Sequence, residues 1–176
     1  MSGKLVGSIL VIIALIAGAA LYYLQVYHFY EPVVVTGEDD VQLTSLVSGL
    51  PETVLYDDFE AIDATSSPIR YRSCFTTSMS LAMATETYVA YQRAEPLEAP
   101  GWFDCFDADA LGAALQDGTA LAFLGTENIT YGIDRIIALT DDGRGYAWHQ
   151  INLCGEKLFD GEPLPDDCPP PPERTE

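Results

Sequence analysis

The feature that most constrains this chain is an apolar run from Leu5 to Leu24 without a charged side chain. As an α-helix, a run of this length extends about 30 Å, which matches the hydrocarbon thickness of a bilayer. We therefore expect a single transmembrane helix at the start of the chain, with the lipid bilayer as its surroundings. The residues that follow then form a domain outside the lipid.

Charged residues beside the run predict its orientation. Lys4 precedes the run, whereas residues 25–69 contain nine Asp and Glu and neither Lys nor Arg. Lys and Arg close to a span stay on the cytoplasmic side, so we expect a cytoplasmic N-terminus. In a bacterium, this places the protein in the inner membrane with its C-terminal domain in the periplasm.

The alternative is that the apolar run is a signal peptide that is removed. Ala17-Gly18-Ala19 has the small–x–small form of a cleavage site. The run continues past this point, however, and then meets aromatic residues that suit a membrane–water interface. We therefore favour an uncleaved anchor over residues 1–30. The aromatic residues are Tyr22, Tyr23, Tyr27, Phe29 and Tyr30.

Three small residues in the run, Gly7, Ala14 and Gly18, fall near one face of the expected helix. Small residues let helix backbones approach closely in lipid. Two interpretations remain open. Small residues are common in membrane helices generally, so these three can be there without a partner. The more specific interpretation is that this stripe packs against a larger integral membrane protein.

The rest of the chain is strongly acidic, with 27 acidic and seven basic residues after residue 24. Residues 31–162 suffice for one domain with a core, and residues 163–176 form a proline-rich acidic tail. This charge excludes nucleic acid as a partner and disfavours anionic lipid headgroups. Solubility explains it, and a basic soluble protein partner would explain it as well.

Four cysteines follow the anchor, and an even number in an oxidising compartment predicts two disulfides. Four cysteines allow three connectivities, and we favour the sequence-local pairing. No pair has CxxC-like spacing, which argues against a metal site and a thioredoxin-type redox site. The favoured pairs are Cys74–Cys105 and Cys154–Cys168.

Local patterns predict an α+β domain built on a mainly antiparallel sheet with one or two short helices. Asp107 or Asp109 can cap a helix that runs through Gln116 and stops at Gly118. Residues 129–139 and 145–153 form a hairpin around Asp142-Gly143, which places Leu139 opposite Tyr146 and Ile137 opposite Trp148. Other predictions are strands at 33–36, 41–47, 53–56, 69–75 and 119–125, a short helix at 78–84 and an acidic loop at 57–67.

Few side chains suggest chemistry. His149 lies on the second hairpin strand, opposite Ile136 in this register, where a lone histidine is usually a satisfied or surface residue. Met79 and Met83 could bind Cu(I) through their thioethers, although core packing explains them better. The aromatic cluster Trp102, Phe103 and Phe106 reads as core, with partner docking as the alternative. Hydrolase and nucleotide-binding motifs are missing, so we expect no cofactor and no enzymatic activity, with an enzyme that uses an unfamiliar site as a weaker alternative.

Six short segments carry a resemblance to known proteins: residues 1–5, 68–75, 101–106, 131–135, 143–146 and 148–150. They resemble a family of uncharacterised alphaproteobacterial membrane-anchored proteins of unknown function. The resemblance strengthens the inner-membrane placement and implies no catalytic residues. Members are sometimes labelled histidine kinases, but neither histidine here has a phosphoacceptor context and no nucleotide lid is present.

These features together predict a non-catalytic protein, an accessory subunit or assembly factor of a larger inner-membrane complex, with respiratory complexes among the candidates. The alternative is a periplasmic redox or copper-handling protein that uses the cysteines, Met79, Met83 and His149.

Overall fold

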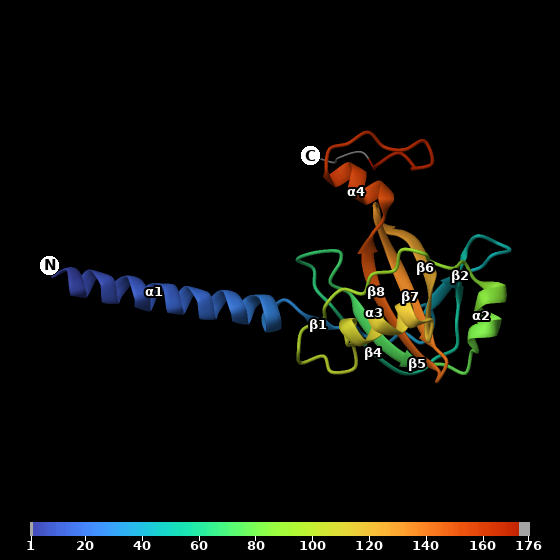
Figure 1. Ribbon diagram of the computed structural model, residues 1–176, viewed down its shortest axis with the longest axis horizontal. Coiled ribbons are helices and arrows are strands. Elements are labelled where there is room, and N and C mark those ends of the chain that lie inside the picture. Colours follow the sequence, from blue (N-terminus) through green and yellow to red (C-terminus); the bar gives the residue numbers. More distant parts are fainter. Residues whose placement is uncertain (1, 173–176) are drawn as a thin grey trace.

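A computed structural model describes residues 2–172 of the chain. Helix α1 (Gly3–Tyr23) continues through one π-helical turn, η1 (Leu24–His28), and extends away from the rest of the molecule (Figure 1). None of the side chains between Gly3 and His28 is buried. The predicted apolar helix is therefore confirmed. It is long and apolar enough to cross a membrane, and a signal sequence would share both properties.

The domain is built on an antiparallel sheet with the strand order β1-β4-β5-β8-β7-β6. β8 lies between β5 and β7, so the last strand of the chain joins the two halves of the sheet. The α+β class and the mainly antiparallel sheet are confirmed. The strands are β1 (Glu31–Pro32), β4 (Asp57–Asp63), β5 (Arg72–Thr76), β6 (Ala120–Thr130), β7 (Ile133–Thr140) and β8 (Arg144–Ile151).

Both faces of the sheet are covered, because successive side chains of each strand point to opposite faces. On one face, the hairpin of β2 (Gln42–Thr44) and β3 (Pro51–Thr53) packs with α2 (Leu81–Thr87). On the other, α3 (Ala108–Asp117) packs with residues 91–106 around Trp148. The domain therefore has two cores, one on each side of the sheet (Figure 1).

Helix α3 begins and ends as its capping residues predict. The Asp107 side chain accepts a hydrogen bond from the Ala110 N–H at 2.9 Å, which satisfies one free donor at the helix start. Gly118 ends the helix with φ 76°, in the left-handed region that glycine enters without steric cost.

The hairpin of β7 and β8 is present, but its predicted register is wrong by one residue. Residues 141–143 form a three-residue loop in which Gly143 has φ 83°, whereas we assumed a two-residue turn. Three-residue loops with a left-handed residue are a common hairpin connection. The observed pairs include Leu139–Gly145, Ile137–Ala147, Ile136–Trp148 and Arg135–His149.

The acidic loop predicted at 57–67 is also wrong, because β4 occupies its first half. Phe59 and Ala61 pack into one core and Ile62 into the other, while the carboxylates between them remain exposed. A bulge between Asp57 and Glu60 interrupts the alternation. Carboxylates on the exposed positions of β4 therefore concealed its apolar pattern.

The remaining predictions are close, with two exceptions. β2, β3, β5, α2 and β6 lie at or near their predicted positions. The strand predicted at 33–36 is replaced by β1, which ends at Pro32, one residue before the predicted strand begins. Helix α4 (Leu153–Phe159), which Asn152 caps, was not predicted. The end of the tail, residues 173–176, lies outside the described residues.

Candidate interaction sites

The domain contacts the end of the anchor helix through Trp102. The Trp102 indole N–H donates to the Val26 carbonyl at 2.7 Å. Its ring stacks on Tyr27 at 6.5 Å between centroids and meets Tyr30 edge-on at 6.0 Å. Aromatic rings of this kind suit a membrane–water interface. The helix end and the domain therefore meet in an aromatic junction rather than through a loose linker.

Arg70 makes the second contact of this junction. Its guanidinium donates to the Gln25 carbonyl at 3.2 Å and to the Gln25 side-chain oxygen at 2.7 Å. It also lies 5.4 Å from the centre of the Tyr30 ring. A crevice of about 430 Å³ lies here between Gln25, Val26 and Tyr30 on the anchor side and Ser67, Arg70, Arg72 and Glu98 on the domain side.

The opposite pole of the domain carries an exposed apolar tip, formed by the β2–β3 loop and α2. Figure 1 shows these elements at the end of the molecule away from α1. Val47 is 98% exposed. The Leu46 N–H donates to the Thr87 carbonyl of α2, and Met83 lies one turn earlier on that helix. We define the distal tip as Leu46, Val47, Leu50 and Met83, all exposed.

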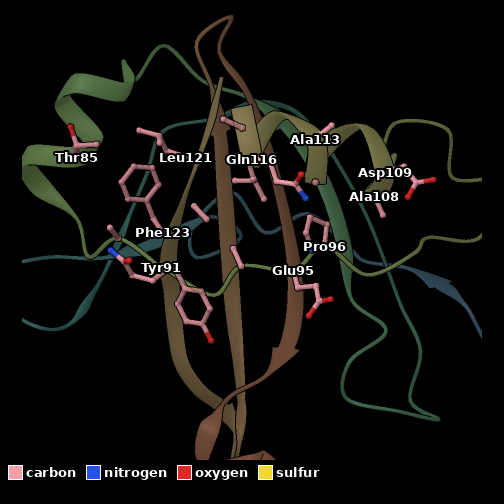
Figure 2. A pocket seen from close by; sticks show the side chains of 17 residues that line it. Thr85, Tyr91, Glu95, Pro96, Ala108, Asp109, Ala113, Gln116, Leu121 and Phe123 are labelled. Carbon is pink, nitrogen blue, oxygen red and sulfur yellow. The ribbon is translucent and has the colours of Figure 1, made fainter. Parts of the chain in front are cut away.

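A groove of about 680 Å³ lies between α3, residues 90–96 and the outer face of β6. Figure 2 shows Thr85 of α2 at one end and Asp109 of α3 at the other, with Tyr91 and Phe123 between them. Small side chains, mainly alanines, form much of its wall. Glu95 and Asp109 supply carboxylates, but none of the lining residues is a cysteine, serine or histidine. The groove therefore suits an apolar or basic segment better than nucleophilic chemistry.

The aromatic segment around Cys105 is divided between the core and the surface. Phe103 and Phe106 are 8% and 5% exposed and belong to the core beneath α3. Trp102 is 37% exposed and lies at the junction. Gly7, Ala14 and Gly18 of α1 lie away from the domain: no residue of α1 is buried, and a Cβ added at either glycine would meet nothing within 4 Å.

His149 is buried and both of its ring nitrogens have partners. Nδ1 donates to the Pro68 carbonyl at 2.7 Å, and Nε2 accepts from Arg135 Nε at 3.1 Å. These contacts fix the neutral ring with its proton on Nδ1. Burial and then the positive charge of Arg135 lower the pKa of His149 to about 4. The ring also stacks on Tyr71 at 4.7 Å. His149 is thus a satisfied core residue.

Asp134 is a buried carboxylate that the sequence did not single out. Its Oδ1 accepts from the Asn128 N–H at 2.9 Å and from Asn152 Nδ2 at 2.7 Å, and its Oδ2 accepts from the Tyr91 hydroxyl at 3.3 Å. Burial, followed by the charge of Asp134, raises the pKa of Tyr91. The network joins the β6–β7 turn to the start of α4, which indicates a structural role. Asn128 has φ 48° and lies at an irregularity of β6 just before the turn, and the enrichment of asparagine at positive φ was the sequence signal for it.

The residues of the redox alternative lie on separate elements. Cys74 is bonded to Cys105, and Cys154 to Cys168, which is the sequence-local pairing. Within residues 2–172 no cysteine is free. Met79 precedes α2 and packs against the core, whereas Met83 belongs to the exposed distal tip. These side chains do not converge with His149 on one site.

Comparisons with known proteins give one match. No curated protein and no solved structure matches the chain at a significant level. One family model, described as a family of unknown function (DUF6446), matches residues 41–169. This range covers all strands from β2 to β8, the three helices of the domain and both disulfides. Because the match covers more than half of the chain, the protein belongs to this family of unknown function.

Proposed function

We propose that this protein is a non-catalytic, membrane-anchored accessory subunit or assembly factor of a larger inner-membrane complex, with respiratory complexes among the candidates. In this proposal, α1 remains in the membrane and the domain lies in the periplasm. The distal tip carries the proposal, because it presents apolar side chains to solvent at the pole opposite the anchor. Contiguous apolar side chains of this kind commonly mark protein interaction sites.

The loop that carries the tip is held by hydrogen bonds rather than left flexible. The Ser45 hydroxyl accepts from the N–H groups of Val47 and Ser48, and the Ser45 N–H donates to the Leu50 carbonyl. The bond from Leu46 to Thr87 then fixes the loop on α2. A loop that is ordered before binding loses less conformational entropy when a partner arrives.

Charge around the tip indicates what kind of partner surface would fit. The Glu52 carboxylate accepts from the Ser48 hydroxyl at 3.0 Å, beside the tip. Glu86 lies on α2 three residues after Met83, so the two share a helix face. β2, β3 and α2 contain no Lys or Arg. A partner surface with an apolar depression and basic residues around it would complement this arrangement.

The cysteines, His149 and Asp134 all have structural partners. The four cysteines form two disulfides, and the ring nitrogens of His149 and the carboxylate of Asp134 are occupied by hydrogen bonds within the domain. The aromatic junction also restricts how the domain is presented. A helix face in lipid and a fixed tip outside it could then contact one large membrane complex together.

The test is to purify the tagged full-length protein and its Val47→Asp variant in mild detergent and to compare how much of a companion protein each one recovers. A charge at the centre of an apolar contact should reduce recovery of a stoichiometric companion at least tenfold. Leu55→Asp is the matched control, because Leu55 is 86% exposed but lies beyond the other end of β3. Absence of any companion from the unaltered protein, or equal recovery with both variants, would contradict the proposal.

A further inference from the structure

Two arginines at the aromatic junction have no carboxylate partner, although the chain has 27 acidic residues. The ion pairs within residues 2–172 involve Arg93, Arg144 and Lys157 only. Arg70 and Arg72 bond to carbonyl and amide oxygens instead. Neutral acceptors leave the positive charge of both groups uncompensated by direct contact. The junction therefore differs electrostatically from the rest of the acidic domain.

Arg70 keeps part of its hydrogen-bonding capacity. A guanidinium has five N–H donors, and Arg70 uses one on each terminal nitrogen for Gln25. Nε and the second N–H of each terminal nitrogen have no partner among the described residues. The planar arrangement of these donors matches the oxygens of a phosphate group.

Arg72 supplies a second positive charge, in the buried part of the same crevice. It is 3% exposed, and its guanidinium donates to the carbonyls of Leu97, Ile69, Tyr71 and Glu98 at 2.7–3.0 Å. These four bonds fix its position. Burial lowers its pKa to about 10, which still leaves it charged at neutral pH. Its field reaches the crevice with little screening by water.

The crevice lies where the headgroups of a bilayer would be. α1 ends at Tyr23, and the aromatic residues that follow mark the water interface if the helix spans. Gln25 and Val26, in the next turn, line the crevice. The two arginines outnumber the one carboxylate of the lining, Glu98. The lining of the crevice therefore carries more positive than negative groups, with Asp63 as a further carboxylate close enough to act on Arg72.

We propose that this crevice binds the phosphate of an anionic phospholipid headgroup, with Arg70 as the direct ligand and Arg72 as the fixed charge behind it. The site rests on the proposed function in one respect, since it requires α1 to remain in the membrane. Binding would hold the acidic domain against the bilayer and set its tilt.

The test uses the full chain in nanodiscs of phosphatidylcholine with increasing phosphatidylglycerol. Trp102 reports on the site because its N–H bonds to Val26, whereas Trp148 is completely buried and gives a constant background. We expect a saturable change in Trp102 fluorescence with phosphatidylglycerol. Arg70→Gln should weaken the response about tenfold, and Arg70→Lys, which keeps the charge without the planar donors, should give an intermediate value.

Arg93→Gln is the matched control, since it removes the same charge from an exposed arginine outside the crevice. Equal responses of the Arg70 and Arg93 variants would overturn the proposal by showing a general charge effect. A full response to millimolar inorganic phosphate in pure phosphatidylcholine would overturn the lipid as the source. Intact mass shows separately whether α1 is retained, and Val47→Asp should leave the lipid response unchanged whatever happens to companion binding.

Discussion

His149 shows how one buried residue can make the stability of the domain depend on pH. Its ring donates to Pro68 and accepts from Arg135, so protonation of Nε2 would break the second bond and place two cations together. The folded-state pKa of about 4 lies below the ordinary value of 6.5. The unfolded chain therefore binds the proton more readily than the folded domain does.

Because this pKa is lowered on folding, the contribution of His149 to stability is fully present above about pH 6.5 and is lost as the pH falls towards 4. We expect the free energy of unfolding to decrease by about 2 kcal/mol more between pH 7 and pH 5 in the unaltered protein than in His149→Gln. Urea unfolding at both pH values measures this difference. Equal losses in the two proteins would show that His149 does not titrate in this range.

For individual residues, sequence spacing predicted contacts between nearby residues but not those between distant ones. The pairing of the cysteines follows from their proximity along the chain, and Asp107 caps α3 through atoms three residues away. By contrast, Asp134 accepts a hydrogen bond from Asn152, which is 18 residues away, and this bond depends on the position of the β6–β7 turn. Long-range polar networks of this kind are set by tertiary packing, which no local pattern encodes.

Among the elements, those with strong local signals were predicted and those without were not. α3 has a cap, an apolar face and a terminal glycine, whereas the charged residues of β4 resemble a loop. The register of the β7–β8 hairpin failed because Asp-Gly fits two loop lengths, and only the packing of both strand faces decides between them. Likewise, α4 is too short to show a clear helical period and depends on packing against the turn at Gly132.

The contact between α4 and the β6–β7 turn gives a prediction about an element. A Cβ atom on Gly155 would lie 2.2 Å from the Gly132 carbonyl oxygen, which is backbone and cannot rotate away. Gly155→Ala should therefore lower the free energy of unfolding by about 1–3 kcal/mol, despite the higher helix propensity of alanine.

Gly112 in α3 provides the control, because a Cβ there meets nothing within 4 Å. Gly112→Ala should raise stability by up to about 1 kcal/mol. Equilibrium urea unfolding followed by tryptophan fluorescence measures both variants. If Gly155→Ala were as stable as Gly112→Ala, α4 would not pack tightly against the turn.

For the whole molecule, the aromatic junction determines how the domain is oriented relative to the helix. The bonds of Trp102 to Val26 and of Arg70 to Gln25 should hold the two parts in one arrangement. Spin labels on cysteines introduced at Lys4 and Asp117 should give one narrow distance distribution in nanodiscs. Trp102→Leu combined with Arg70→Gln should broaden it, and Arg93→Gln should not. A broad distribution in the unaltered protein would show that the domain moves freely.

The position of β8 between β5 and β7 has a consequence for how the protein matures. β5 is synthesised about 70 residues before β8, so the edge of β5 that pairs with β8 has no partner until those residues have emerged. The bond between Cys74 and Cys105 involves only earlier residues and can form during that interval. Early formation of this disulfide would tether β5 to the segment that covers it and protect its unpaired edge from aggregation during folding.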